Sequence, residues 1–146
     1  MKRVYIDRHF CIGCGLCELA CLTVHSRSKD LAIAYTVERP QGLMSFKKVF
    51  RDGSMCASTG CRHCDEPACV EACIAGALTK DPATGRTVYD PEQCVGCMSC
   101  LMACPFGAIS KSPLEDKIVK CDRCVELDMP ACVQACPNRA LMYEER

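Results

Sequence analysis

Cysteine is the residue type in this sequence whose abundance and spacing could do chemistry. The chain has 146 residues and 17 cysteines, and all but one of the cysteines fall into four groups of four. The groups are Cys11, Cys14, Cys17 and Cys21; Cys61, Cys64, Cys69 and Cys73; Cys94, Cys97, Cys100 and Cys104; and Cys121, Cys124, Cys132 and Cys136. Because this cysteine content is far above usual composition, it requires a covalent or a metal explanation.

The spacing within the groups favours iron–sulfur clusters. Groups one and three have the compact form Cys-x2-Cys-x2-Cys-x3-Cys, in which three neighbouring thiolates can hold three corners of one cuboidal cluster. Proline follows Cys104 and Cys136, as it follows the last cysteine of the run in two-cluster bacterial ferredoxins. The pattern therefore predicts four [4Fe–4S] clusters, with all the grouped cysteines as metal ligands.

Two other uses of cysteine are weaker alternatives. Zinc also binds Cys-x2-Cys pairs, so a zinc-organised binding module stays open, although three cysteines in one compact loop are unusual for zinc. A disulfide framework needs an oxidising compartment. Residues 1–9 contain no apolar run of the length of a secretory signal, and no stretch is long enough to span a membrane. We therefore expect a soluble, cytoplasmic protein.

The charge balance depends on the clusters. The chain has 18 basic and 18 acidic residues, which gives a formal net charge of zero. Each cluster with its four thiolates is a dianion, so four clusters would bring the charge to about −8. We expect a partner with a basic docking face, and neither nucleic acid nor direct membrane insertion.

Three of the four groups continue alike after their last cysteine. The continuations contain Ala77-Leu78, Ala108-Ile109 and Ala140-Leu141. In each pair the small alanine allows close packing beside a cluster, and we expect the aliphatic residue to begin a short strand. The first group departs from this template after Cys21, so its exit path should differ. Such internal similarity indicates duplication.

Short elements are predicted around the cysteine loops. Strands are expected at 4–6, near 78–79, at 87–89 and at 118–119. The turn at 81–85 contains proline and glycine and should join the second and third of these strands in a hairpin. One turn of helix is expected at 70–73 and another at 133–136. Residues 22–60 show no strong periodicity, so we expect a connecting excursion over the surface.

Several polar residues have no assigned ligand role. We expect Cys56 to be a buried free thiol, with an alternate ligand or redox thiol near the second group as the other reading. His63 should be a half-exposed loop residue, although its place between two cysteines would also allow a hydrogen bond to sulfur. His9 and His25 carry no spacing typical of ligation. Solvated surface is expected for Lys47, Lys48, Lys117, Lys120 and Arg123, with docking as the alternative.

A family resemblance lies in four stretches. These are 11–21 with the following His25-Ser26-Arg27-Ser28-Lys29, Cys61-Arg-His-Cys64, Cys94-Val-Gly-Cys97 and Lys120-Cys121-Asp122. The arrangement resembles the small iron–sulfur subunits of hydrogenases, formate dehydrogenases and molybdenum or tungsten oxidoreductases. Within that family it looks closest to the iron–sulfur protein associated with carbon monoxide dehydrogenase. The resemblance is specific for clusters and weakly specific for the partner.

The resemblance implies an α+β fold made of two fused bacterial-type dicluster ferredoxin modules. A central module over 54–112 would hold groups two and three. A split module, 1–36 plus 113–146, would hold groups one and four, and 37–53 would connect the two modules. Each module then contains one compact and one spread cysteine group.

Ligands are expected to cross between the groups of a module. The helix that carries each fourth cysteine leads away from its own loop and toward the neighbouring cluster. The expected sets are Cys61, Cys64 and Cys69 with Cys104; Cys94, Cys97 and Cys100 with Cys73; Cys11, Cys14 and Cys17 with Cys136; and Cys121, Cys124 and Cys132 with Cys21.

The predicted function is electron transfer without a substrate site. The sequence contains no phosphate-binding glycine motif and no nucleophile elbow, and the grouped thiolates leave little chain for a pocket. We predict a relay of single electrons between a redox enzyme, similar to carbon monoxide dehydrogenase, and another acceptor or donor. The alternative is a permanent subunit of an aldehyde, formate or hydrogen oxidoreductase.

Overall fold

Short strands and short helices alternate along the chain. The computed structural model describes residues 1–145. The strands are β1 (Arg3–Ile6), β2 (Lys48–Asp52), β3 (Met55–Thr59), β4 (Leu78–Lys80), β5 (Thr87–Tyr89), β6 (Ile109–Lys111), β7 (Ile118–Lys120) and β8 (Leu141–Glu144). The helices are α1 (Leu16–His25), α2 (Leu31–Ile33), the π-helical turn η1 (Ala34–Glu38), α3 (Ala68–Glu71), α4 (Ser99–Ala103) and α5 (Ala131–Gln134). This mixture agrees with the α+β class.

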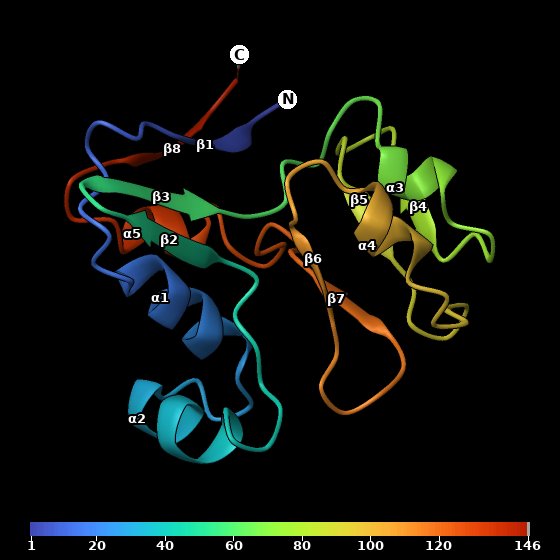
Figure 1. Cartoon of the computed structure of the whole chain (residues 1–146), viewed down its shortest axis with the longest axis horizontal. Helices are drawn as coiled ribbons and strands as arrows, with labels where there is room; N and C mark the ends of the chain where they lie inside the picture. The colour runs from blue at the N-terminus through green and yellow to red at the C-terminus, as the bar shows by residue number, and fades with distance from the viewer. Residues whose placement is uncertain (146) are drawn as a thin grey trace.

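The strands of the described part pair as antiparallel two-stranded ribbons. The pairs are β1 with β8, β2 with β3, β4 with β5, and β6 with β7. In the first ribbon Arg3 lies opposite Glu144 and Ile6 opposite Leu141, so the first and last strands lie side by side (Figure 1). A two-stranded ribbon is marginally stable alone, so each ribbon depends on what packs against it.

The predicted elements next to the cysteines are present. The hairpin is formed by β4 and β5, with Leu78 opposite Tyr89, and the strands predicted at 4–6 and 118–119 lie within β1 and β7. The predicted helical turns begin two residues earlier than expected, as α3 and α5. Each starts directly after a proline, Pro67 or Pro130, whose restricted φ and missing N–H suit the beginning of a helix.

The surface excursion predicted for residues 22–60 is wrong, because much of this segment is regular. Helix α1 continues to His25, α2 and η1 follow, and β2 and β3 form a hairpin. Side chains hold the turn after α1: the Glu38 carboxylate accepts hydrogen bonds from the backbone N–H of Arg27 (2.8 Å) and Ser28 (2.9 Å). Asp30 caps α2 by accepting from the N–H of Ile33 at 2.9 Å.

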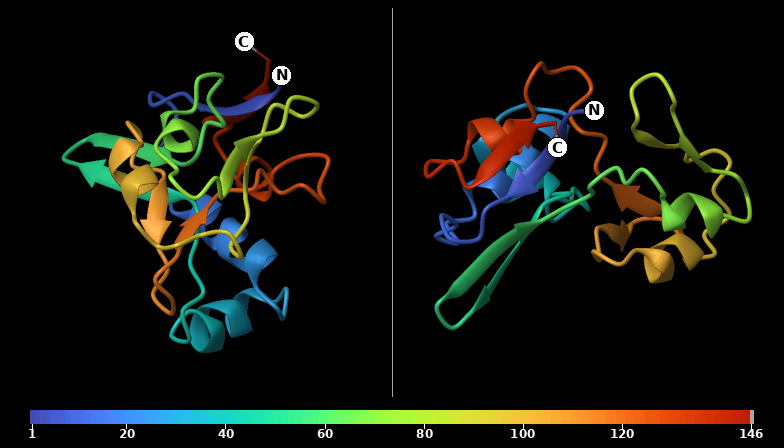
Figure 2. Two further views of the ribbon diagram at one scale, coloured as in Figure 1. Left: turned by 90° about the vertical axis from the view of Figure 1, so that its right-hand side faces the viewer. Right: turned by 90° about the horizontal axis from the view of Figure 1, so that it is seen from above.

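Two separate hydrophobic clusters form the interior. One contains buried Leu78, Cys100, Ile109 and Ile118, and the other contains Cys17, Cys132 and Leu141 with Val4 and Val49 packed against them. Figure 2 shows the same division in its right-hand view. The green, yellow and orange segments that contain α3, α4 and β6 lie on one side, and the blue and red segments that contain α1, α5 and β8 lie on the other. Both clusters are small and include cysteines, so the interior is built around the thiols.

No helix among residues 1–145 combines the length and the apolar character needed to cross a bilayer.

Candidate metal centres

The four cysteine loops share one backbone turn. In every group the residue directly before the second cysteine has a positive φ: 65° at Gly13, 48° at His63, 72° at Gly96 and 67° at Arg123. Two of these residues are not glycine, and a positive φ is costly for a side chain of this size. The shared conformation shows that the groups are structural repeats as well as sequence repeats.

Glycine is required for space at the two compact loops. A Cβ on Gly96 would overlap the backbone carbonyl oxygen of Asp116. A Cβ on Gly13 would lie 2.7 Å from Sγ of Cys56 and 3.0 Å from Nε of Arg51. Other parts of the chain therefore pack directly on the backbone of both loops.

The template after the last cysteine is confirmed in groups two, three and four. In each of these groups a turn follows the last cysteine, and the backbone N–H of the residue three positions later donates to the carbonyl of that cysteine. The bonds run from Gly76 to Cys73 (3.2 Å), from Gly107 to Cys104 (3.2 Å) and from Arg139 to Cys136 (3.3 Å). The following Ala and aliphatic residue are buried, and the aliphatic residue begins β4, β6 or β8. The expected departure of group one is also confirmed, because Cys21 lies inside α1.

Cavities open among the cysteines, and each draws thiols from at least two groups. One cavity is lined by Cys11, Cys14, Cys17 and Cys136. A second is lined by Cys73, Cys94, Cys97 and Cys100. A third is lined by Cys21, Cys121, Cys124 and Cys132, with Cys61 also on its wall.

The remaining cysteines gather around Cys69. Burial, with the nearby thiolates of Cys61, Cys104 and Cys64, raises the pKa of Cys69 to about 11. Burial and neighbouring thiolates likewise raise the pKa of Cys132 to about 11. Crowded buried thiols resist ionisation unless a positive charge compensates them, and metal ions supply that charge.

Several sulfur atoms accept hydrogen bonds from the chain. Backbone N–H groups donate to Cys21 from Phe46 (3.3 Å), to Cys121 from Arg123 (3.3 Å) and to Cys104 from Ala108 (3.5 Å). Hydrogen bonds to sulfur stabilise thiolates and are one of the factors that set cluster potentials. Crowded thiols, cavities between them and donors aimed at sulfur together fit iron–sulfur clusters.

His63 is buried, and its predicted half-exposed position is wrong. Its Nδ1 accepts a hydrogen bond from the N–H of Thr87 at 3.1 Å. Burial and the nearby cations, Lys120 foremost, lower the pKa of His63 to about 3, so the ring is neutral and its proton lies on Nε2. That nitrogen is buried without a partner among the described residues, and the ring lines the third cysteine cavity.

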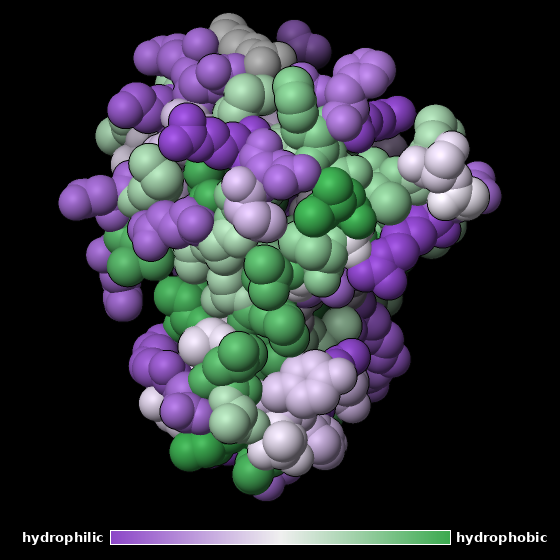
Figure 3. All heavy atoms as spheres, turned by 90° about the vertical axis from the view of Figure 1, so that its left-hand side faces the viewer, coloured by the Kyte–Doolittle hydropathy of each residue, from purple (hydrophilic) through white to green (hydrophobic). Residues whose placement is uncertain are grey.

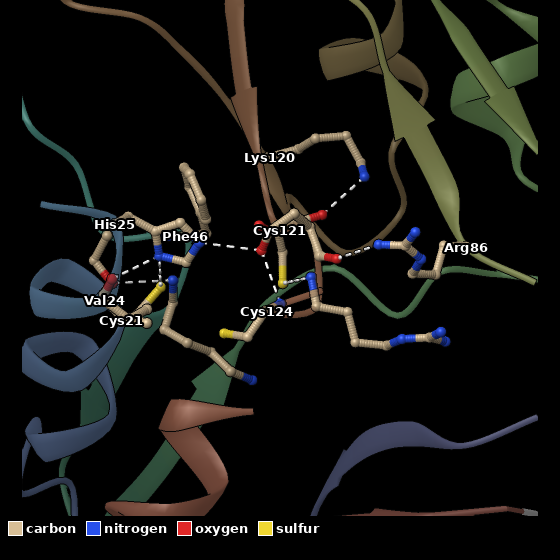
Figure 4. A network of polar contacts seen from close by, with 12 residues as sticks. Cys21, Val24, His25, Phe46, Arg86, Lys120, Cys121 and Cys124 are labelled. Carbon is tan, nitrogen blue, oxygen red and sulfur yellow. Dashed lines mark hydrogen bonds and ion pairs between the residues drawn. The ribbon is translucent and has the colours of Figure 1, made fainter. Parts of the chain in front are cut away.

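His25 joins two cysteine groups, a role that its spacing did not indicate. Its Nδ1 donates to the carbonyl of Cys21 (2.7 Å) and its Nε2 contacts Oδ1 of Asp122 (3.1 Å), as Figure 4 shows in part. Burial lowers the pKa of His25, but the hydrogen bonds to Asp122 and Cys21 outweigh it and raise the pKa to about 10. The same Asp122 oxygen accepts from the N–H of Cys124 at 2.9 Å. Helix α1 is thus tied to the loop of group four.

Two lysines predicted at the solvated surface lie inside. Lys47 and Lys120 are 8% and 7% exposed. The ammonium of Lys120 donates to the carbonyls of Thr87 (2.6 Å) and Cys121 (2.9 Å), which joins β5 to the fourth cysteine loop (Figure 4). The prediction failed for Lys120 because the apolar stem of a lysine can be buried where its ammonium finds acceptors.

Cys56 lies against the loop of the first cysteine group. It is half-buried on β3 opposite Arg51, and its thiol faces Gly13. Arg51 fastens the hairpin to the same loop, since its Nε donates to the carbonyl of Gly13 at 2.8 Å. No disulfide joins any of the 17 cysteines.

Residues 54–146 match the model of the 4Fe–4S dicluster domain, and residues 10–24 match a 4Fe–4S binding domain. The protein belongs to the 4Fe–4S dicluster domain family. The two matches together cover all four cysteine groups, so the prediction of four [4Fe–4S] clusters is confirmed and the zinc alternative is set aside.

Relatives of this dicluster protein are found among redox proteins of Escherichia coli (strain K12). The sequence is 34% identical over 145 residues to the putative electron transport protein YsaA, covering 97% of this chain and 88% of that protein. It is 35% identical over 146 residues to YnfG, a probable anaerobic dimethyl sulfoxide reductase chain, covering 95% and 71%. These relatives confirm the predicted resemblance to iron–sulfur electron-transfer proteins that work with redox enzymes.

A solved structure shares the fold of the dicluster protein. It is the active site complex BamBC of benzoyl coenzyme A reductase, with a TM-score of 0.52 and 24% sequence identity over all of this chain and 78% of that chain. This likeness concerns the fold alone.

Proposed function

We propose that the protein relays single electrons through its four clusters to or from an oxidoreductase and has no substrate site of its own. The observation that carries this proposal is that cysteines from different sequence groups line the same cavities. Each of the three cysteine cavities combines the last cysteine of one group with the first three cysteines of another, so neighbouring clusters would be held by one continuous framework. A partner similar to carbon monoxide dehydrogenase and a cytoplasmic location remain part of the proposal.

The proposed ligand sets are those in which each fourth cysteine crosses to the partner group. The cavity linings support three of them: Cys11, Cys14, Cys17 with Cys136; Cys94, Cys97, Cys100 with Cys73; and Cys121, Cys124, Cys132 with Cys21. The electrostatic neighbourhood of Cys69 supports the fourth, Cys61, Cys64, Cys69 with Cys104.

We also propose that the chain is two fused dicluster modules, one of them split in sequence. The two hydrophobic clusters and the pairing of β1 with β8 support this division. Strand β7 pairs with β6, so we place the end of the central module after residue 120 instead of 112. Val49 packs against the other cluster, so the β2–β3 hairpin goes with the split module.

A permanent subunit of an oxidoreductase complex is the second candidate function. Apolar side chains gather on the face that holds α1 and α2 (Figure 3). Leu16, Leu31 and Ile33 are 43%, 46% and 46% exposed there. Exposed apolar surface of this kind favours a lasting protein contact over brief collisions. The relative YnfG, named as part of a reductase, supports the same reading.

Anaerobic purification with metal and redox analysis tests the proposal. We expect about 16 iron and about 16 acid-labile sulfide per chain, and uptake of about four electrons in a coulometric titration. Co-purification with a large catalytic subunit would favour the permanent subunit. Zinc in place of iron, or no reversible electron uptake by a fully loaded protein, would overturn the relay.

A further inference from the structure

Lys47 is a buried cation without an acidic partner. Its side chain is 8% exposed and lies just before β2. Within residues 1–145 no carboxylate pairs with its ammonium, and the ammonium makes no hydrogen bond to a described residue. The ammonium is not one of the buried side-chain atoms left without a partner, so it keeps contact with solvent, and a cation at this boundary is stabilised by a nearby negative charge.

Thiols surround Lys47 on the side of the third cysteine cavity. Lys47 lines that cavity with Cys21, Cys121, Cys124 and Cys132. Burial raises the pKa of Cys132, and the positive charge of Lys47 opposes that rise. Lys47 opposes the effect of burial on the pKa of Cys17 in the same way. Cys132 packs with Cys17 in one hydrophobic cluster, so Lys47 lies beside thiols of two proposed ligand sets.

Gly60 leaves room for this lysine. A Cβ at Gly60 would lie 3.0 Å from Cδ of Lys47 and 3.2 Å from its Nζ. The lysine side chain thus runs across the backbone of the residue directly before Cys61, which also lines the cavity. The position of the ammonium is set by packing and not by a hydrogen-bonding partner.

Two other cations nearby, Lys120 and Arg123, differ from Lys47 because their charged groups have hydrogen-bonding partners. The ammonium of Lys120 donates to the carbonyls of Thr87 and Cys121. The guanidinium of Arg123 donates to the carbonyls of Lys2 and Thr84, both at 3.1 Å. These groups have structural partners, whereas the ammonium of Lys47 has none among the described residues.

We propose that Lys47 is the shared counter-charge of two clusters and raises the reduction potential of both. The clusters are those of Cys11, Cys14, Cys17 and Cys136 and of Cys121, Cys124, Cys132 and Cys21, so the inference rests on the ligand sets of the proposed function. Reduction adds negative charge to a cluster, and a cation in a poorly solvated interior stabilises the reduced state more than the oxidised state.

The experiment compares potentials in the holoprotein. Lys47→Met removes the charge and keeps an apolar stem, Lys47→Arg keeps the charge, and Lys48→Met removes a half-exposed charge one residue away. We expect Lys47→Met to shift two of the four cluster potentials to more negative values in an anaerobic redox titration followed by EPR. Lys47→Arg and Lys48→Met should leave all four in place.

The outcomes separate this inference from the proposed function. Four unshifted potentials in fully loaded Lys47→Met would overturn the inference and leave the relay intact, whereas wild type without four clusters would overturn the relay. If Lys47→Met loses clusters and Lys47→Arg retains them, the counter-charge is supported. Cluster loss in both variants would assign Lys47 a packing role and overturn the inference.

Discussion

The N–H of Thr87 donates a hydrogen bond to Nδ1 of His63 over 3.1 Å, and this contact decides which ring nitrogen carries the proton. The ring is neutral because burial and nearby cations lower its pKa to about 3. Its Nε2–H is therefore a donor without a partner among the described residues, on the wall of a cavity that Cys61 and Cys121 also line. Strand β5 thus orients the ring of His63, which lies on the wall of a cavity lined by thiols.

Replacing His63 by Leu should change both stability and one potential. The variant removes the Nε2–H donor and leaves the buried N–H of Thr87 without an acceptor, which costs about 1–3 kcal/mol. We expect a lower urea midpoint under anaerobic conditions and a more negative potential for one cluster, since hydrogen bonds to sulfur raise cluster potentials. Thr87→Ala, which keeps the backbone N–H, is the control. An unshifted set of potentials in a fully loaded variant would contradict the role of Nε2.

Sequence alone predicted the elements that local residues determine. Ala77-Leu78 and its two counterparts predicted buried alanines and strand starts, because the turn after each cysteine closes within a few residues. The hairpin of β2 and β3 was missed because its strands show no clean alternation and are held by distant contacts, such as Arg51 on Gly13. Local pattern cannot report contacts made across dozens of residues.

The same limit applies to the site. Cysteine spacing predicted the iron–sulfur clusters, since cluster binding demands that residue type at those intervals. The residues around the ligands were not predictable in this way. His25, His63 and Lys47 take their roles from Asp122, Thr87 and the third cavity, and no spacing along the sequence links these partners.

Gly96→Ala should be much more damaging than Gly76→Ala. Both glycines have positive φ, 72° and 65°, so either substitution brings backbone strain of about 1–2 kcal/mol. Only at Gly96 would the new Cβ collide with the backbone, at the carbonyl oxygen of Asp116, whereas nothing lies within 4 Å at Gly76. We expect Gly96→Ala to lose iron from the third group and Gly76→Ala to keep a full complement. Equal iron content in the two variants would show that space at Gly96 is unimportant.

Removing the clusters should unfold the chain. Both hydrophobic clusters are small and contain cysteines. Metal–thiolate bonds therefore supply folding free energy that a larger domain obtains from its apolar core. After chelation under reducing conditions, far-UV circular dichroism should show that most structure is lost. A chelated protein that still melts cooperatively would mean that the ribbons and helices are stable without metal.

Ligand crossover can be tested by asking which variants disturb the same cluster. Cys73 lines one cavity with Cys94, Cys97 and Cys100, although it belongs in sequence to the second group. If it ligates their cluster, Cys73→Ser and Cys97→Ser should alter the same EPR signal. Each should lower iron from about 16 to about 12 per chain, or convert one cluster to a lower-iron form. The double variant should then disturb no further cluster, because both serines act on one site.

The control for crossover is Cys64→Ser, since Cys64 belongs to the same sequence group as Cys73. Crossover requires that Cys64→Ser and Cys73→Ser alter different signals and that their double variant disturbs two clusters. The direction of the chain is the physical reason: α3 carries Cys69, and the turn after it delivers Cys73 against α4, next to Cys100. If Cys73→Ser and Cys64→Ser instead disturb one shared signal, each group holds its own cluster and the proposed ligand sets are wrong.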